Sequence, residues 1–243
     1  MADSFKVLSL LLSYPTAETV AAAADMRRRI EADALVPARL RRPLFELIDE
    51  LTTSDLFDLQ ERYVLLFDRT RSLSLHLFEH IHGESRDRGQ AMVDLMALYE
   101  RHGLSIEAKE LPDYIPMFLE FLSTLPTEEA RTLLAEPLHI LSALKERHQK
   151  RGSAYAIVFR ALETIAQGKA RPDDVKNLLA EADDDPDDLE ALDRVWEEEA
   201  VTFGPGNAGT VAPGGSCPAA RQVLARMDPT SNPSAPQGGR IDG

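Results

Sequence analysis

Apolar residues recur every three or four positions from residue 3 to about residue 182, which is the spacing of one face of an α-helix. Prolines, glycines and capping residues divide this region into about nine or ten helices. Thr16 and Ser54 are the expected N-caps of two helices, over residues 16–33 and from residue 54, and Pro137 is expected to kink or split a long helix. We therefore predict an all-α fold, a single-domain helical bundle whose helices begin near residues 3, 16, 37, 54, 74, 85, 116, 126, 153 and 172.

The pattern changes after residue 182. Eleven acidic residues and one arginine lie between residues 181 and 199, and residues 201–243 hold 8 of the 13 glycines and 6 of the 15 prolines. Such a segment buries too little apolar surface to offset a backbone ordering cost of ~1–2 kcal/mol per residue. We predict a helical domain over residues 1–182, an acidic linker over 183–200 and a disordered tail over 201–243.

Charge and composition exclude several classes of protein. The net charge is −14, and no long face carries the positive excess that nucleic-acid binding requires. The single cysteine, Cys217, excludes an internal disulfide framework and a cysteine-rich metal site. No run of ~20 apolar residues is present, so we expect no membrane insertion and a cytoplasmic protein.

One motif has the spacing of a catalytic metal site. His76, Glu79 and His80 match the H-x-x-E-H pattern of one class of zinc peptidases, and on a helix they would share a face. A third ligand has no distinguishable candidate, and His82 would lie about 200° from His80 on a continuing helix. A zinc-dependent hydrolase is therefore the alternative hypothesis, and we predict no catalytic or metal-binding residue.

Two polar segments are less easily explained as packing. Residues 75–90 interleave His, Glu, Arg and Asp with apolar residues at a turn between helices, which indicates a hydrogen-bond network, a recognition surface, or both. In residues 110–122, Pro112 and Pro116 stiffen a connection that presents Asp113 and Tyr114. Met117 and the phenylalanines after it are typical of a core, or of the edge of a groove for a partner helix.

These segments carry a resemblance to a known family. Residues 72–104 (SLSLHLFEHIHGESRDRGQAMVDLMALYERHGL), 110–126 (ELPDYIPMFLEFLSTLP), 196–204 and 62–68 resemble the NarJ-type nitrate reductase molybdenum cofactor assembly chaperones. These belong to the wider group of redox-enzyme maturation chaperones that includes TorD and DmsD. With the helix order, the resemblance covers about residues 5–205. The family usually has a histidine after the Pro-Asp pair, where this chain has Tyr114.

The resemblance implies an all-helical protein without catalytic activity. It implies binding, in the cytoplasm, to the N-terminal segment of the apo catalytic (alpha) subunit of respiratory nitrate reductase. The chaperone would bind no cofactor permanently, but would assist insertion of the molybdopterin guanine dinucleotide cofactor into this client before membrane attachment. Proteins of molybdenum cofactor biosynthesis are further expected partners, and a helical adaptor for another client is the remaining alternative. The candidate client-binding residues are Tyr63, Phe67, Glu79, His80, His82, Arg86, Glu110, Asp113, Tyr114 and Met117.

Overall fold

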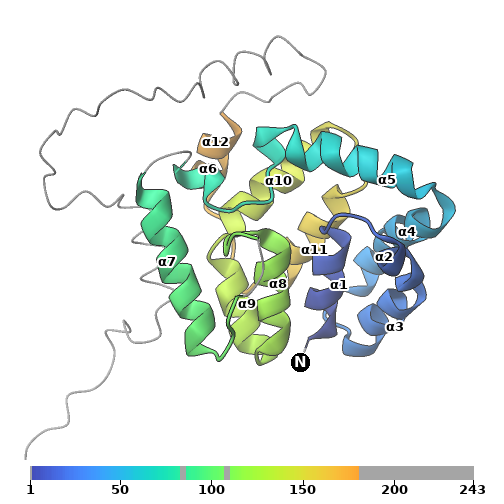
Figure 1. The fold of residues 1–243 in the computed structure, drawn as a ribbon, viewed down its shortest axis with the longest axis horizontal. Helices are drawn as coiled ribbons and strands as arrows, with labels where there is room; N and C mark the ends of the chain where they lie inside the picture. Colours follow the sequence, from blue (N-terminus) through green and yellow to red (C-terminus); the bar gives the residue numbers. More distant parts are fainter. Residues whose placement is uncertain (1, 83–85, 107–109, 181–243) are drawn as a thin grey trace, which may run out of the picture.

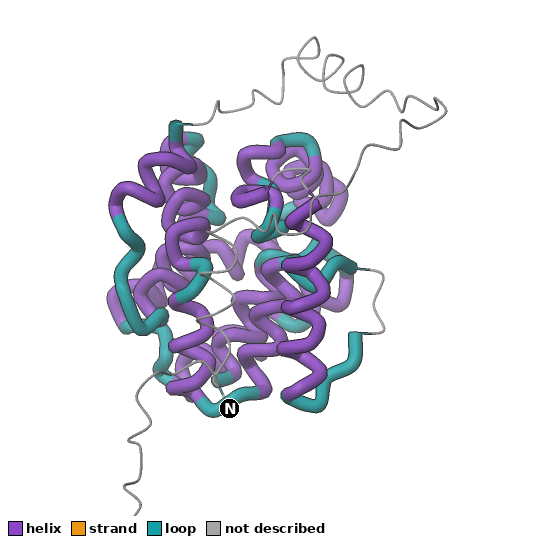
Figure 2. Tube along the Cα trace, turned by 90° about the vertical axis from the view of Figure 1, so that its left-hand side faces the viewer, coloured by secondary structure: helices purple, strands orange, loops and turns teal. Residues whose placement is uncertain are grey.

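The computed structural model describes residues 2–82, 86–106 and 110–180, which form a bundle of helices (Figure 1). Figure 2 shows helices packed on helices, with no strand in the described ranges beyond one isolated bridge. The predicted all-α fold is therefore confirmed. The helices are α1 (Asp3–Leu11), α2 (Ala17–Ala21), α3 (Ala23–Asp33), α4 (Ala38–Thr53), α5 (Leu56–Tyr63), α6 (Glu79–His82), α7 (Arg86–Arg101), α8 (Ile115–Thr124), α9 (Thr127–Ala135), α10 (Leu138–Lys150), α11 (Ala156–Ile165) and α12 (Pro172–Leu179).

The core lies between two groups of helices. Helix α1 packs against α3 and α8, while α10 packs against α11 and α12 and α4 joins the two groups through α3 and α11. Phe5 and Leu8 of α1 and Phe118 of α8 are almost fully buried, as the three- and four-residue spacing predicts. The Ser9 hydroxyl donates a buried hydrogen bond of 2.7 Å to the Pro116 carbonyl, so α1 is also fixed to the start of α8.

Two predicted helices are each split, which gives twelve α-helices in the described ranges rather than nine or ten. The predicted N-cap at Thr16 is confirmed, because its hydroxyl accepts the Thr19 N–H at 3.2 Å. The helix that follows is interrupted at Ala22, which the sequence did not indicate. The break at Pro137 is confirmed, since proline offers no N–H to continue the helix from α9 into α10.

The predicted helix from residue 54 differs at both ends. Its N-cap is Asp55 rather than Ser54, because the Asp55 carboxylate accepts the Phe57 N–H at 2.8 Å. Beyond Tyr63 the helix widens into a π-helix, η1 (Val64–Asp68), and the Arg69 N–H donates to the Val64 carbonyl five residues earlier. A short 3₁₀ turn, η2 (Arg71–Leu73), follows.

The largest error concerns the predicted helix over residues 74–82, of which only Glu79–His82 is helical. Residues 74–78 precede it in an irregular conformation, because their backbone groups bond to another segment of the chain. The last described helix, α12, ends at Leu179. The predicted acidic linker and tail lie outside the described residues. None of the described helices is long and apolar enough to cross a membrane.

Candidate functional site

The two polar segments predicted from the sequence meet at one place. His76 and Tyr114 form an isolated antiparallel bridge. The Leu77 N–H donates to the Asp113 carbonyl at 3.0 Å, and the Ile115 N–H donates to the Leu75 carbonyl at 2.8 Å. Residues 74–80 together with residues 112–115 are called the paired junction below. Its backbone bonds explain why the predicted helix over 74–82 does not form.

A buried carboxylate organises the paired junction. Asp113 is fully buried, and its carboxylate accepts the Phe78 N–H at 3.0 Å and lies 3.1 Å from His76 Nδ1. Burial alone would lower the pKa of His76, but the hydrogen bond and negative charge of Asp113 outweigh it and the pKa is raised. The carboxylate thus holds the start of α6 against the start of α8.

Glu79 and His80 are held by a second set of bonds. The Ser74 hydroxyl donates to the Glu79 carboxylate, which also accepts an Arg88 N–H at 3.0 Å. His80 is buried and its Nε2 lies 2.8 Å from the Ser74 carbonyl. Burial lowers the pKa of His80, so its ring is neutral and donates this bond. Both side chains therefore connect α6 to the segment before it.

The zinc-peptidase hypothesis rests on a helical face that does not exist. His76 precedes α6 and bonds to Asp113, whereas His80 bonds to a backbone carbonyl, so the two imidazoles do not converge. Among the described residues, no three His, Cys, Asp or Glu side chains are placed to share a metal ion. The motif is part of a structural network.

Tyrosines connect the paired junction to α1 and α5. The Tyr63 hydroxyl lies 3.0 Å from the Leu12 carbonyl and 2.9 Å from the Tyr114 hydroxyl. Burial raises the pKa of both phenols, so both remain protonated at neutral pH. The Tyr114 ring also packs on His76, with 5.4 Å between ring centroids. Tyrosine at this position therefore supplies stacking and one hydrogen bond.

The predicted residues differ in how accessible they are. Phe67 is buried in an aromatic cluster, 4.8 Å from Tyr63 and 5.0 Å from Tyr155 between ring centroids. Met117 is half-buried against the core, and Glu110 is exposed. The side chains of His82 and Arg86 are outside the described part of the structure. The paired junction thus unites Glu79, His80, Asp113 and Tyr114, with Tyr63 behind it and Glu110 beside it.

Two further charged residues adjoin the paired junction and were not predicted. Asp68, at the end of η1, has a pKa raised by burial and then by the nearby charge of Glu110. Arg147 of α10 is buried, and its guanidinium donates to the Ser72 carbonyl at 2.7 Å and the Leu178 carbonyl at 2.6 Å. Nothing in the sequence distinguishes Arg147 from a solvated basic residue on a helix.

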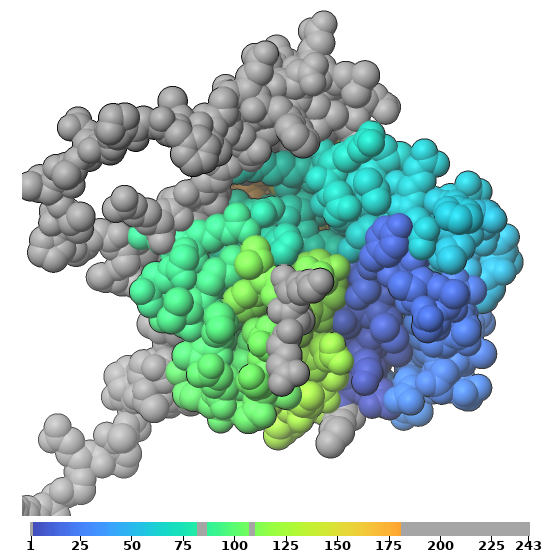
Figure 3. Space-filling view, viewed as in Figure 1, coloured from blue at the N-terminus to red at the C-terminus, as the bar shows by residue number. Residues whose placement is uncertain are grey.

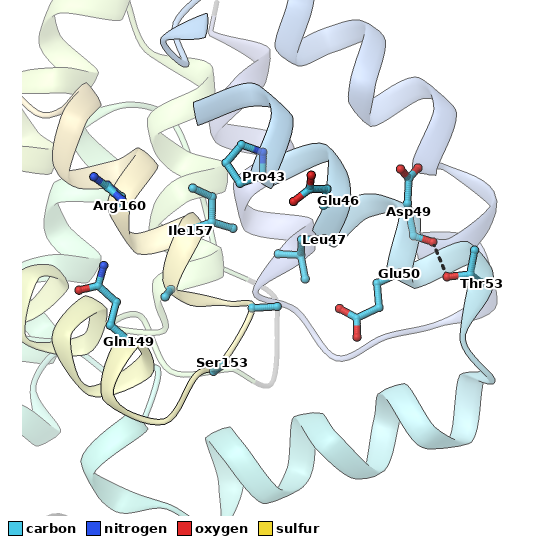
Figure 4. A pocket seen from close by; sticks show the side chains of 12 residues that line it. Pro43, Glu46, Leu47, Asp49, Glu50, Thr53, Gln149, Ser153, Ile157 and Arg160 are labelled. Atoms are coloured by element: carbon cyan, nitrogen blue, oxygen red, sulfur yellow. Dashed lines mark hydrogen bonds between the residues drawn. The ribbon is translucent and has the colours of Figure 1, made fainter. Parts of the chain in front are cut away.

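The surface hollows lined by described residues include the α4 groove and the α5 groove. The α4 groove, of about 600 Å³, lies between α4 and the helices α10 and α11 (Figure 4). Glu46, Asp49 and Glu50 line one side of it, but each carboxylate already has an arginine partner, at Arg42, Arg27 and Arg62 respectively. The α5 groove, of about 440 Å³, is lined by four apolar side chains and by Asp58, Glu61 and Arg69. Its apolar residues are Tyr14, Phe57, Val64 and Leu65.

Comparison with known proteins places the chain in a family. Residues 33–161 match the family described as "Nitrate reductase delta subunit". The chain is 45% identical over 199 residues to "Nitrate reductase molybdenum cofactor assembly chaperone NarJ" of Escherichia coli (strain K12), covering 81% of this chain and 83% of that protein.

Two further relatives have the same kind of name. "Probable nitrate reductase molybdenum cofactor assembly chaperone NarW" of the same strain is 41% identical over 84% of each chain. The corresponding NarJ protein of Bacillus subtilis (strain 168) is 32% identical over 67% of this chain and 89% of its own. The chain therefore belongs to the nitrate reductase delta subunit family and, within it, to the NarJ type.

Proposed function

We propose that this chain is an assembly chaperone for a respiratory nitrate reductase. It binds the apo catalytic (alpha) subunit in the cytoplasm, notably the N-terminal segment of that subunit. Binding keeps the subunit competent for insertion of the molybdopterin guanine dinucleotide cofactor and precedes its attachment to the membrane. The chaperone itself catalyses no reaction.

The observation that carries this proposal is the extent of the similarity to relatives named as assembly chaperones. The 45% identity to the Escherichia coli NarJ protein runs through more than four fifths of both chains. It therefore includes most of the helical bundle and is not confined to one motif. A shared fold alone would be a weak argument for function, because folds host unrelated activities.

The chemistry of the paired junction supports binding rather than catalysis. The Asp113 carboxylate is enclosed by hydrogen bonds to Phe78 and His76, and the His80 imidazole is committed to a backbone carbonyl. A general acid or base needs a lone pair or proton directed at a substrate. These groups instead fix the geometry of the segments around them.

The edge of the paired junction has groups that a protein segment can contact. Leu111 is 45% exposed, Glu110 is exposed, and Tyr114 is half-buried beside them. Of the ten candidate residues, we propose that Glu79, Glu110, Tyr114 and Met117 are accessible to the client. The buried Tyr63, Phe67, His80 and Asp113 act by positioning, and His82 and Arg86 stay predictions. Micromolar to nanomolar binding corresponds to about 8–12 kcal/mol, which still permits release.

Co-expression tests the proposal. The full chain should co-purify with the apo catalytic subunit, and should release it once the molybdenum cofactor is inserted. In cells that lack their own maturation chaperone, the chain should restore the molybdenum content of the purified reductase. Failure to capture the apo subunit, together with unchanged molybdenum content, would refute the assignment. Equal capture of an unrelated apo molybdoenzyme would favour a general adaptor instead.

A further inference from the structure

The two surface grooves differ in whether their carboxylates are already paired with arginines. In the α4 groove, the carboxylates of Glu46, Asp49 and Glu50 all pair with arginines of the same chain. In the α5 groove, Asp58, Glu61 and Arg69 form no ion pair with any described residue. A partner that enters the α5 groove therefore finds charges that are still free to bind it.

The α5 groove also exposes aromatic surface. Phe57 is 78% exposed and Tyr14 is 44% exposed, and both line the same hollow, where gathered apolar surface is typical of an interaction site. Burying one such side chain stabilises a complex by roughly 1.5–3 kcal/mol. The Asp55 cap holds the backbone of Phe57 in place, so this ring is presented from a fixed helix start.

The π-helix η1, which continues directly from α5, also lines the α5 groove. Val64 and Leu65 face the groove, while Phe67 of the same five-residue element is buried in the core. Wide π turns occur in proteins mostly as single turns within α-helices, and frequently at functional sites. This one short element therefore contributes to both the core and the groove.

Side-chain contacts through the buried Tyr63 link the α5 groove to the paired junction. The Tyr14 ring meets the Tyr63 ring edge-on at 5.6 Å, and the Tyr63 hydroxyl bonds to that of Tyr114. Gln60 Nε2 donates to the Pro15 carbonyl at 2.8 Å, which fixes the segment after α1 against α5. Figure 3 shows these segments, coloured blue and cyan, adjoining on one face of the molecule.

We infer that the α5 groove is the docking surface for an apolar segment of the client that also carries a basic side chain. An apolar anchor of this segment packs between Phe57, Tyr14 and Leu65, and its lysine or arginine lies against Asp58 and Glu61. The volume of about 440 Å³ is within the roughly 300–1,000 Å³ of ligand pockets and holds a few side chains. The identity of the partner rests on the proposed function, whereas the place and chemistry of docking rest on the groove.

Titration calorimetry with the full chain tests this inference. The probes are a synthetic peptide with the N-terminal sequence of the catalytic subunit and the purified apo subunit. Phe57→Ala should weaken peptide binding at least tenfold, because an exposed ring contributes to binding and not to the core. The double variant Asp58→Asn, Glu61→Gln should weaken it about fivefold and reduce its dependence on salt.

The matched control is Val93→Ala on α7. Val93 is 58% exposed and α7 lies on the opposite side of the bundle from α5 (Figure 1), so binding should stay within twofold of the unchanged chain. Binding of Phe57→Ala that equals the control would overturn the inference. So would a concentration-dependent dimer in light scattering that Phe57→Ala abolishes, because a second copy would then occupy the groove.

The proposed function can fail separately. If the unchanged chain captures neither the peptide nor the apo subunit, the assignment of the client is wrong. If it captures the subunit but not the peptide, the same variants are compared by co-purification with the subunit. Loss with Phe57→Ala and not with Val93→Ala then supports the groove, and equal capture refutes it.

Discussion

Replacing Asp113 by alanine should destabilise the protein rather than simply weaken client binding. The change leaves the buried Phe78 N–H without its acceptor, which costs roughly 1–3 kcal/mol, and removes the bond to His76. Relief from burying a carboxylate offsets part of this loss. We expect the free energy of unfolding to fall by about 2–4 kcal/mol, which lowers Tm by roughly 4–16 °C for a domain of this size.

Urea unfolding followed by circular dichroism measures this change. Asp113→Asn keeps the shape and one acceptor, so it should lose about half as much stability, and Glu110→Ala, at an exposed position, should lose less than about 0.5 kcal/mol. A change below about 0.5 kcal/mol for Asp113→Ala would refute the reasoning. If client binding were nevertheless lost, Asp113 would be a contact residue, as the sequence alone predicted.

The stability that the His76–Asp113 pair contributes should depend on pH. The pKa of His76 is raised in the folded protein, so protonated His76 contributes stability that is fully present below an unfolded pKa of about 6.5. This contribution is lost as pH rises through the folded pKa. The difference in stability between the unchanged chain and Asp113→Ala should therefore be larger at pH 6 than at pH 9. An equal difference at both values would show that His76 is not charged in the pair.

Three further changes test other contacts. His148 is fully buried, neither ring nitrogen has a hydrogen-bond partner among the described residues, and burial lowers its pKa to about 3. In the unfolded chain His148 takes up a proton below about pH 6.5, so the free energy of unfolding falls as the pH falls. His148→Phe should therefore make the free energy of urea unfolding less dependent on pH between 6.5 and 4.5. Arg147→Met removes the donor to the Leu178 carbonyl, so amide exchange in α12 should quicken about tenfold or more while α1 exchange changes less. Ser9→Ala removes the bond to Pro116 and should cost about 1 kcal/mol in urea unfolding; an unchanged midpoint would contradict it.

Most helices were predictable because their causes are local. The apolar spacing of Phe5 and Leu8 places α1 without knowledge of its neighbours, and Pro137 has no N–H to donate to the helix before it. The error at Ser54 has a local cause too, since Asp55 beside it is an equally good cap and reaches the Phe57 N–H. The break at Ala22 has no glycine or proline to signal it.

The candidate site was predictable in its segments but not in its bonds. Residues 74–82 have helical spacing, yet Leu77 and Leu75 form backbone hydrogen bonds with residues 36 and 40 positions later. Propensity is a weak signal that such tertiary bonds override. The pairing of His76 with Asp113 depends on the same long-range contact, so one sequence alone could show that both residues were unusual but not that they meet.

The number of residues in the π-helix η1 sets how the chain after it is rotated relative to α5. In an α-helix each residue advances the side chains by about 100°, so removing one residue from Val64–Asp68 would turn everything after it relative to α5. The shorter helix would have more regular hydrogen bonds, but Phe67 would leave its aromatic cluster or Leu65 would leave the groove. A length change of one residue here would therefore matter more than most substitutions, because Phe67 and Leu65 could no longer keep their core and groove positions at the same time.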